Sequence, residues 1–151
     1  MIPPLRFIVD GEPSTDHRPR CTCPRGKPHL RQSTSYKKWK SACKVSAETA
    51  LRAWSEENGP WPFGRTMLYA VRTYAITAKG RKDADNAGRG LRDACQGLLW
   101  RSDQRCRPVV DDIGHLDELD EAPPGMMVEV IAYDRRKTLV TVELVLREQG
   151  P

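Results

Sequence analysis

The strongest constraint on the fold of this chain is an apolar stripe with the period of an α-helix. Apolar side chains recur every three or four positions at Trp39, Cys43, Ala47, Ala50 and Trp54. This spacing predicts a helix over residues 35–58 with one face turned towards a core. Ser35 is a favourable N-cap, and the run Asn58-Gly59-Pro60 ends the helical pattern. Other segments must cover the apolar face of this helix.

Segments with the two-residue period of β-strands surround the helix. Residues 5–9 predict a short strand, residues 66–77, 126–133 and 138–146 predict longer ones, and residues 105–110 are a further candidate. A second helix is predicted for residues 86–99. Its apolar face would consist of Ala87, Leu91, Ala94, Cys95 and Leu98. This order of strands and helices predicts a small α+β domain with a mixed or antiparallel sheet.

The length and hydropathy of the chain indicate one soluble domain over residues 1–151. A chain of 151 residues can bury a core of modest size, and no run of about 18 apolar residues predicts a transmembrane helix. The N-terminal sequence MIPPLR lacks the basic and then apolar regions of a signal peptide. We therefore expect a cytoplasmic protein that does not partner a membrane.

Residues 14–33 are basic and rich in proline, and they follow neither the helix nor the strand period. We expect a long basic loop here, and loops of this length are often functional. Within it, Cys21 and Cys23 lie close to His29 and could supply half of a zinc site. No second pair of zinc ligands is evident in the sequence. Five cysteines at irregular spacings also fit free thiols in a reducing compartment.

Charge is distributed unevenly along the chain. The segment from residue 6 to residue 44, nearly the first third of the chain, contains the basic residues Arg6, Arg18, Arg20, Arg25, Lys27, Arg31, Lys37, Lys38, Lys40 and Lys44. Only Asp10, Glu12 and Asp16 oppose them, which leaves this third at about +7, whereas residues 111–121 are strongly acidic. A basic lobe suits a polyanion such as nucleic acid, and it also suits a solubilising surface.

Asp83 and Asp85 lie two residues apart, where the predicted strand gives way to the second helix. In extended backbone, side chains at i and i+2 share a face, so both carboxylates can point at one site. Mg²⁺ prefers such oxygen ligands, and it can activate water and neutralise charge on a phosphoryl group. Cations that suit phosphodiester chemistry surround the pair, at Lys79, Arg81, Lys82, Arg89 and Arg92. The local alternatives are a helix cap at Asp85, a favourable charge at the helix start, and surface ion pairs.

Asp103 follows Asp85 by eighteen residues, just beyond the predicted helix. About fourteen helical residues rise roughly 21 Å, so a straight hairpin would separate the two carboxylates. Asp103 would join the site only from a strand that returns alongside, or from a second subunit. Asp111 and Asp112 are a rival source of a third carboxylate.

The run Lys82-Asp83-Ala84-Asp85-Asn86 and the residues after it resemble the RusA family of Holliday junction resolvases, the crossover junction endodeoxyribonucleases. The downstream part of the resemblance consists of Arg89, Asp93-Ala94, Gly97 and Trp100-Arg101-Ser102-Asp103. The upstream part consists of Gly11-Glu12-Pro13, Arg18-Pro19-Arg20 and the stretch from Tyr36 to Trp39. Together these matches extend over roughly residues 7–130, most of the chain.

The resemblance implies a compact α+β fold that forms a homodimer and cuts branched DNA with Mg²⁺, for which Mn²⁺ can substitute. It implies that Asp83, Asp85 and Asp103 hold the metal and that Arg89 stabilises charge during catalysis. A twofold dimer would present two identical sites, as the paired cuts across a four-way junction require. The candidate contacts to DNA phosphates are Arg18, Arg20, Lys79, Arg81 and Lys82.

Two positions depart from the pattern of that family. Arg89 stands where the family usually has a catalytic lysine; arginine keeps the charge but does not give up its proton. Ser102 stands where the family commonly has the first Asp of a pair, which puts metal affinity in question. The alternative is therefore a catalytically weak or inactive, structure-selective DNA-binding protein. A ribonuclease or general nuclease with the same metal site is a third hypothesis.

Trp61 and Phe63 follow the first predicted helix and could insert into the centre of a DNA junction, because aromatic side chains can open base steps. The alternative for both is burial in the core or in a dimer interface.

Overall fold

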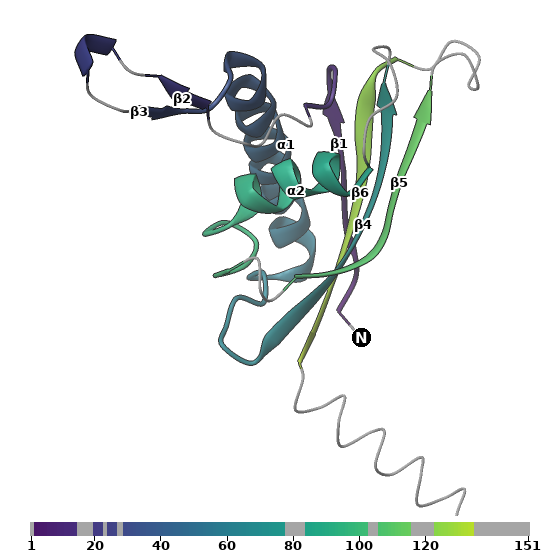
Figure 1. The fold of residues 1–151 in the computed structure, drawn as a ribbon. Coiled ribbons are helices and arrows are strands. Elements are labelled where there is room, and N and C mark those ends of the chain that lie inside the picture. The colour runs from purple at the N-terminus through teal and green to yellow at the C-terminus, as the bar shows by residue number, and fades with distance from the viewer. Residues whose placement is uncertain are drawn as a thin grey trace, which may run out of the picture.

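The computed structural model describes residues 2–14, 20–22, 24–26, 29–77, 84–102, 106–115 and 123–134, with backbone alone at 20, 22, 24, 29, 30, 84, 85 and 106–115. Two α-helices, α1 (Thr34–Asn58) and α2 (Ala84–Cys95), lie on one face of a four-stranded sheet (Figure 1). This arrangement confirms the expected α+β class. None of the described helices is long and apolar enough to cross a membrane.

The sheet consists of β1 (Leu5–Asp10), β4 (Met67–Thr77), β5 (Cys106–His115) and β6 (Gly125–Asp134), in the order β1-β6-β4-β5. β6 pairs antiparallel with both β1 and β4, whereas β5 runs parallel to β4, so the sheet is mixed as expected. A parallel neighbour requires a crossover connection, and α2 provides it between β4 and β5. β5 extends past the candidate strand at 105–110. The strand predicted for residues 138–146 lies outside the described residues.

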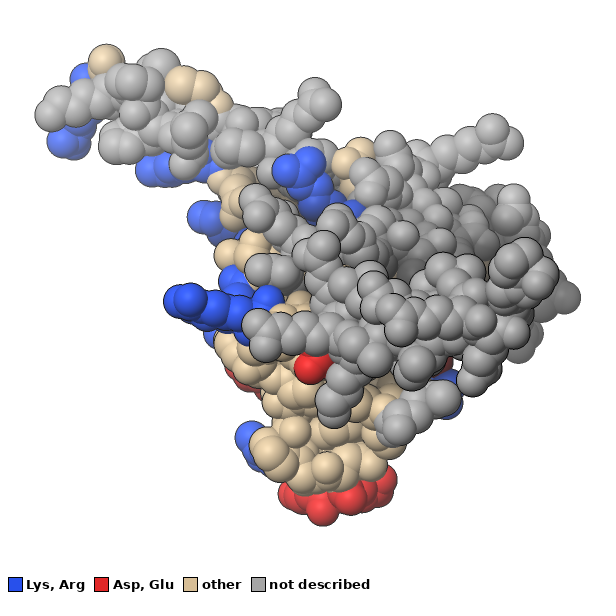
Figure 2. Space-filling model, turned by 90° about the horizontal axis from the view of Figure 1, so that it is seen from below, with Lys and Arg blue, Asp and Glu red and all other residues tan. Residues whose placement is uncertain are grey.

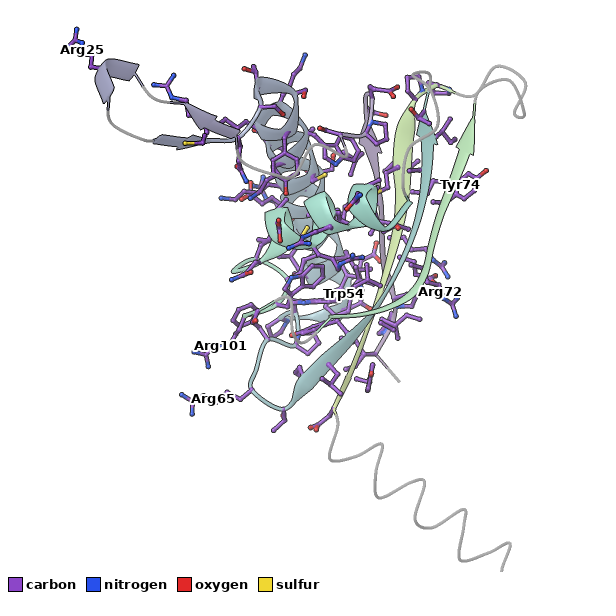
Figure 3. The ribbon with its side chains drawn as sticks, viewed as in Figure 1. Arg25, Trp54, Arg65, Arg72, Tyr74 and Arg101 are labelled. Carbon is purple, nitrogen blue, oxygen red and sulfur yellow. The ribbon has the colours of Figure 1, made fainter. Side chains whose placement is uncertain are left out.

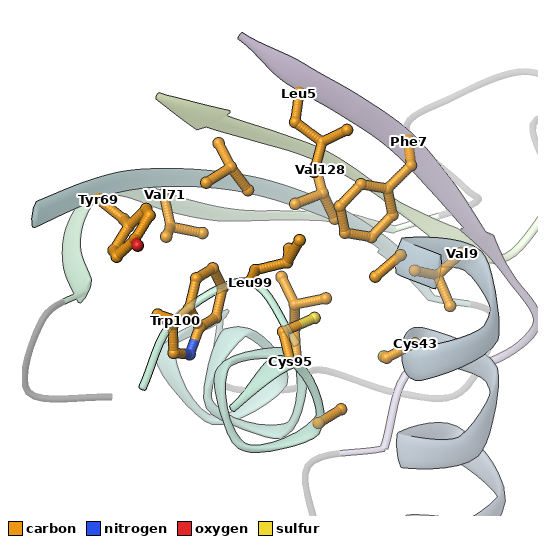
Figure 4. Close-up of a cluster of buried hydrophobic side chains, with 14 of the residues drawn as sticks. Leu5, Phe7, Val9, Cys43, Tyr69, Val71, Cys95, Leu99, Trp100 and Val128 are labelled. Carbon is orange, nitrogen blue, oxygen red and sulfur yellow. The ribbon is translucent and has the colours of Figure 1, made fainter. Parts of the chain in front are cut away.

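Alternation along the central strand β4 builds the core. Its side chains alternate between a buried face and a more exposed face over the whole strand. Tyr69 and Val71 lie on the buried face and pair with Ala132 and Val130 of β6, which are buried as well. Figure 4 shows this face of the sheet packed against side chains from the two helices. The helices therefore cover one side of the sheet only.

α1 confirms the predicted apolar stripe but begins slightly earlier than expected. Its N-cap is Ser33, whose Oγ accepts a hydrogen bond from the backbone N–H of Tyr36 at 3.2 Å. The sequence prediction placed the cap at Ser35. Serine is a good cap at both 33 and 35, so cap preference alone does not separate the two positions. The earlier start places Tyr36, which is fully buried, inside the first turn of the helix.

α2 spans Ala84–Cys95 rather than the predicted 86–99, so the prediction was wrong at both ends. Gly97 adopts a positive φ of 83°, which ends the helix by turning the chain. The N–H of Gly97 then donates to the carbonyl of Trp100 at 2.7 Å. Apolar residues continue past Cys95 to Leu98, Leu99 and Trp100, and this pattern suggested a longer helix. They are apolar because Leu99 and Trp100 are buried as part of this turn instead.

The basic segment contains a hairpin where a loop without strands was expected. β2 (Arg20–Thr22) and β3 (His29–Arg31) pair antiparallel around a short 3₁₀ turn, Pro24–Gly26. Arg25 and Gly26 both have positive φ, which reverses the chain within a few residues. Strands of three residues are too short to show a period in the sequence. Figure 1 shows this β2–β3 arm standing away from the body of the protein.

Trp61 is a core residue, so its proposed role as a wedge in DNA is wrong. Its ring is 9% exposed and lies edge-on to Trp54 at 5.0 Å between centroids. Its Nε1–H donates to the carbonyl of Leu99 at 2.9 Å, which satisfies the one polar group of the indole. Phe63 differs, because it is 46% exposed.

We predict that Gly125→Ala destabilises the protein by about 1–3 kcal/mol. A Cβ at this position would lie 2.8 Å from the backbone carbonyl oxygen of Val9, so β1 or β6 must shift. Chemical denaturation measures the change. Gly64→Ala is the matched control, because the nearest atom to its Cβ is the flexible Met67 Cγ at 3.8 Å. Equal stability of the two variants would contradict close packing at Gly125.

Candidate functional site

Four chain segments meet at one end of the sheet. β1 ends at Asp10, β4 ends at Thr77, β5 ends at His115, and β6 begins at Gly125. The register pairs Asp10 with Gly125 and Thr77 with His115. We call this the upper end of the sheet, because it lies at the top of Figure 1. The acidic motif follows in the chain directly after β4 leaves this end.

A partly buried hydrogen bond joins one of the sequence motifs to the end of β4 at the upper end. The hydroxyl of Thr77, 2% exposed, donates to the carboxylate of Glu12. Pro13 and Ser14 are buried beside it, and the N–H of Gly11 donates to the carbonyl of Pro124 at 3.1 Å. The Gly11-Glu12-Pro13 motif is therefore fixed to the last residue of β4. Glu12 and Thr77, which precede the basic stretch and the acidic motif in the chain, therefore lie side by side.

The acidic motif lies at the start of α2. Asp85 is the second residue of the helix, so it does not occupy the N-cap position that was the local alternative to a metal site. Asp83 lies outside the described residues, and only the backbone of Asp85 is described. Positions 85, 89 and 93 follow one another at helical spacing and therefore share one face of α2. Arg89, the candidate for charge stabilisation, is exposed on this face.

Tyr36 connects this face of α2 to α1. Its hydroxyl donates to Oδ2 of Asp93 at 2.8 Å, and its ring lies 5.7 Å from Nζ of Lys40. Burial and the Asp93 carboxylate together hold the pKa of Tyr36 well above its usual range, while the charge of Arg89 acts in the opposite direction. Tyr36 is therefore a neutral donor that fixes Asp93, and it brings Lys40 and Arg89 to the same region.

Most of the other predicted site residues lie outside the described part of the chain. These are Asp103, Arg18, Lys79, Arg81 and Lys82, and of Arg20 only the backbone is described, in β2. The rival pair Asp111-Asp112 belongs to β5, where the backbone pairs with Thr73 and Tyr74 of β4. Ser102 is half-buried after the turn that follows α2.

The described thiols do not form a metal centre. Cys43 and Cys95 are buried between α1 and α2, and burial raises the pKa of the Cys43 thiol far above its usual value, so it stays protonated. Cys21 is exposed on the β2–β3 arm, whereas Cys23 and His29 lack described side chains. Among the side chains that the structure places, no group of three His, Cys, Asp or Glu could hold a metal ion.

The face of the sheet opposite the helices is open among the described residues. A shallow hollow of about 880 Å³ runs across it, lined in part by Ile8, Tyr74 and Met127. At its centre Glu129 accepts hydrogen bonds from Arg6 at 2.7 Å and from Arg72 at 3.1 Å. The bond from Arg6 lowers the pKa of Glu129. Figure 3 shows Arg72 and Tyr74 pointing away from the helical side.

No protein-family model matches this chain, and no curated protein matches it either.

Sequence reasoning missed two residues that shape this region. Glu12 was considered as an acidic residue near the basic segment and as part of a motif, and nothing in the sequence shows that its carboxylate reaches Thr77, 65 positions later. Tyr36 falls within the helical stripe, and nothing in the sequence shows that its hydroxyl reaches a residue 57 positions later.

We predict that Tyr36→Phe lowers the free energy of unfolding by about 1–2 kcal/mol, because Asp93 loses its donor at the junction of the helices. Urea denaturation measures the loss. Tyr74→Phe removes the same hydroxyl from the open sheet face and should change stability by less than about 0.5 kcal/mol. A Tyr36 variant as stable as the unaltered protein would show that the bond contributes nothing.

Proposed function

We propose that this protein is a Mg²⁺-dependent endonuclease that resolves Holliday junctions and other branched DNA by paired, symmetric phosphodiester cuts. The observation that carries the proposal is the contact between Glu12 and Thr77 at the upper end of the sheet. It ties the stretch leading to Arg18 and Arg20 to the stretch leading to Asp83 and Asp85. The carboxylates and cations that phosphodiester cleavage needs therefore belong to two chain segments that both follow this contact.

Asp83, Asp85 and Asp103 are the residues that would hold the metal in this proposal. Their carboxylate oxygens are the hard ligands that Mg²⁺ prefers, and Mn²⁺ accepts the same donors. When bound, Mg²⁺ supplies water activation and charge neutralisation. Arg89, exposed four residues after Asp85 on α2, faces solvent where a phosphate can approach, and its fixed charge stabilises the negative charge that develops on the phosphate.

The alternative function is structure-selective DNA binding with little or no cleavage. Arg89 and Ser102 favour it, because neither supplies the proton donor or the carboxylate that the resembling family has at these positions. Both hypotheses share the basic surface and differ only in metal-dependent chemistry. Cleavage of a labelled four-way junction with Mg²⁺ or Mn²⁺, compared with EDTA, separates them. Equal cutting of junction, duplex and single strands would instead indicate a general nuclease.

We predict that Asp83→Asn and Asp85→Asn each reduce junction cleavage by at least about 100-fold, because each removes a charged metal ligand. Junction binding in EDTA should stay within about twofold of the unaltered protein, since no cation is lost. Glu57→Gln is the matched control: it removes a carboxylate at the exposed far end of α1 and should leave cleavage unchanged. Cleavage at a near-normal rate in either Asp variant would overturn the metal site.

We also propose that the protein acts as a homodimer and that the open sheet face is its interface. Ile8 and Met127 on this face are 62% and 50% exposed. Strands β4, β5 and β6 have ten or eleven residues and β1 has six, so the sheet presents a face of at most roughly 19 Å by 33 Å, on the order of 600 Å². This area approaches the ~800 Å² that each partner buries in a stable complex. The face also carries both signs of charge at its centre, so a twofold copy can pair Arg6 or Arg72 with the partner's Glu129.

For the dimer, we predict that Ile8→Lys or Met127→Lys yields a monomer, because each buries an unpaired charge in the interface. Light scattering after size-exclusion chromatography gives the mass directly. Val45→Lys is the control, since Val45 is 58% exposed on α1, away from this face. A monomeric unaltered protein at micromolar concentration, or dimeric lysine variants at Ile8 and Met127, would exclude this interface.

A further inference from the structure

The charges of α1 are arranged against its own helix dipole. The N-terminus of a helix carries partial positive charge and favours acidic side chains, and the C-terminus favours basic ones. In α1 the first turn contains no acidic residue and the last turn no basic residue. Lys37 closes the first turn, while Glu56 and Glu57 lie in the last. Between Asp16 and Glu48 the sequence contains no acidic residue at all. Helix stability does not explain this pattern, whereas an external polyanion does.

The lysines of α1 fall on two different flanks. Lys40 lies over the ring of Tyr36, which bonds Asp93 of α2, so Lys40 and its i−3 neighbour Lys37 lie on the flank next to α2. Lys38 lines a hollow with Asp10, Ser41 and Val45 on the other flank, towards β1. The two sides of the helix can therefore be tested separately, with neighbouring residues of the same type.

Further basic residues extend the flank next to α2 in both directions. Arg89 is exposed on α2 beside Tyr36, close enough for its charge to act on that phenol. Arg31 is exposed at the end of β3, two residues before the Ser33 cap, and Arg25 is exposed at the tip of the β2–β3 arm, as Figure 3 shows. In Figure 2 the Lys and Arg side chains gather on the side from which the arm projects, and the visible acidic ones gather mainly at the opposite end.

We propose that Arg25, Arg31, Lys37 and Lys40, which we call the α1 track, bind the sugar-phosphate backbone of one duplex arm of the DNA substrate. The inference rests on the proposed function for the identity of the substrate. The track begins beside Arg89 of the cleavage site and leads outward to the β2–β3 arm. Contacts of this kind set register and orientation and carry no base specificity, which suits recognition of DNA by shape. The arm would then guide a duplex away from the branch point.

The test measures DNA affinity by fluorescence anisotropy in EDTA, over a series of KCl concentrations, with a labelled four-way junction and a short duplex. The double variant Arg31→Ala with Lys37→Ala should bind both DNAs at least about 10-fold more weakly. The slope of log K against log salt should decrease by about 2, since each phosphate contact contributes roughly 0.9. In cleavage assays the loss should appear as a higher DNA concentration for half-maximal cleavage, because both residues contact DNA and neither belongs to the metal site.

Lys38→Ala with Arg52→Ala is the matched control, because it removes the same amount of charge, from Lys38 on the other flank of α1 and from the exposed Arg52 nearer the C-terminal end of this helix. Its salt slope should equal that of the unaltered protein. Equal losses in both double variants would overturn the track, since only the overall charge would then matter.

If Asp83→Asn abolishes cleavage while the Arg31/Lys37 variant binds normally, the track is wrong and the proposed nuclease stands. If the unaltered protein binds DNA through the track but never cuts, the nuclease is wrong and the track stands.

A second measurement tests the origin of the charge pattern. Lys37→Glu should keep or raise the melting temperature, because it complements the helix dipole, and it should weaken DNA binding at least about 10-fold. Lys38→Glu makes the same change one residue along and should affect stability in the same direction while weakening binding less. A lower melting temperature for Lys37→Glu would show that Lys37 serves the fold, and it would overturn its assignment to the track.

Discussion

The central strand β4 is the element on which the other parts of this structure depend. It pairs with β6 on one side over ten successive positions and with β5 on the other. The antiparallel partner β6 in turn holds β1, so the whole sheet forms around β4. Because β5 runs parallel to β4, the chain must cross over between them, and α2 is that crossover. The position of α2, which carries the acidic motif, therefore follows from the direction of β5.

The junction of α1 and α2 then decides which functional groups lie near one another. Gly90 allows close approach, because a Cβ there would lie 3.2 Å from the Trp39 ring and 3.3 Å from that of Tyr36. The bond from Tyr36 to Asp93 fixes the same contact from the polar side. As a result, Arg89 on the helix that carries the acidic motif and Lys40 on the basic helix both lie near Tyr36. In the proposed nuclease, this geometry would make the cleavage site continuous with the proposed phosphate-binding surface.

The sequence by itself determined the class of the fold and the chemistry to look for. Two periods, 3.6 and 2.0 residues, located α1, β1, β4 and β6, because burying one face of each element requires those spacings. The Asp83-Ala84-Asp85 motif could also be recognised in the sequence, because metal binding needs particular side chains at short separations. Element ends were less certain. The end of α2 depended on the positive φ of Gly97, and the β2–β3 hairpin on two such residues, neither of which leaves a periodic signal.

Only the tertiary structure decided which distant residues meet. The contact of Glu12 with Thr77 and that of Tyr36 with Asp93 link positions 65 and 57 residues apart, and no local pattern encodes such pairs. The same holds for Trp61, whose sequence context allowed either a DNA wedge or burial and whose position is in the core. The two flanks of α1 also became distinct only when α2 packed against one of them. Local spacing sets which groups a segment carries, whereas packing between segments sets which groups can act together.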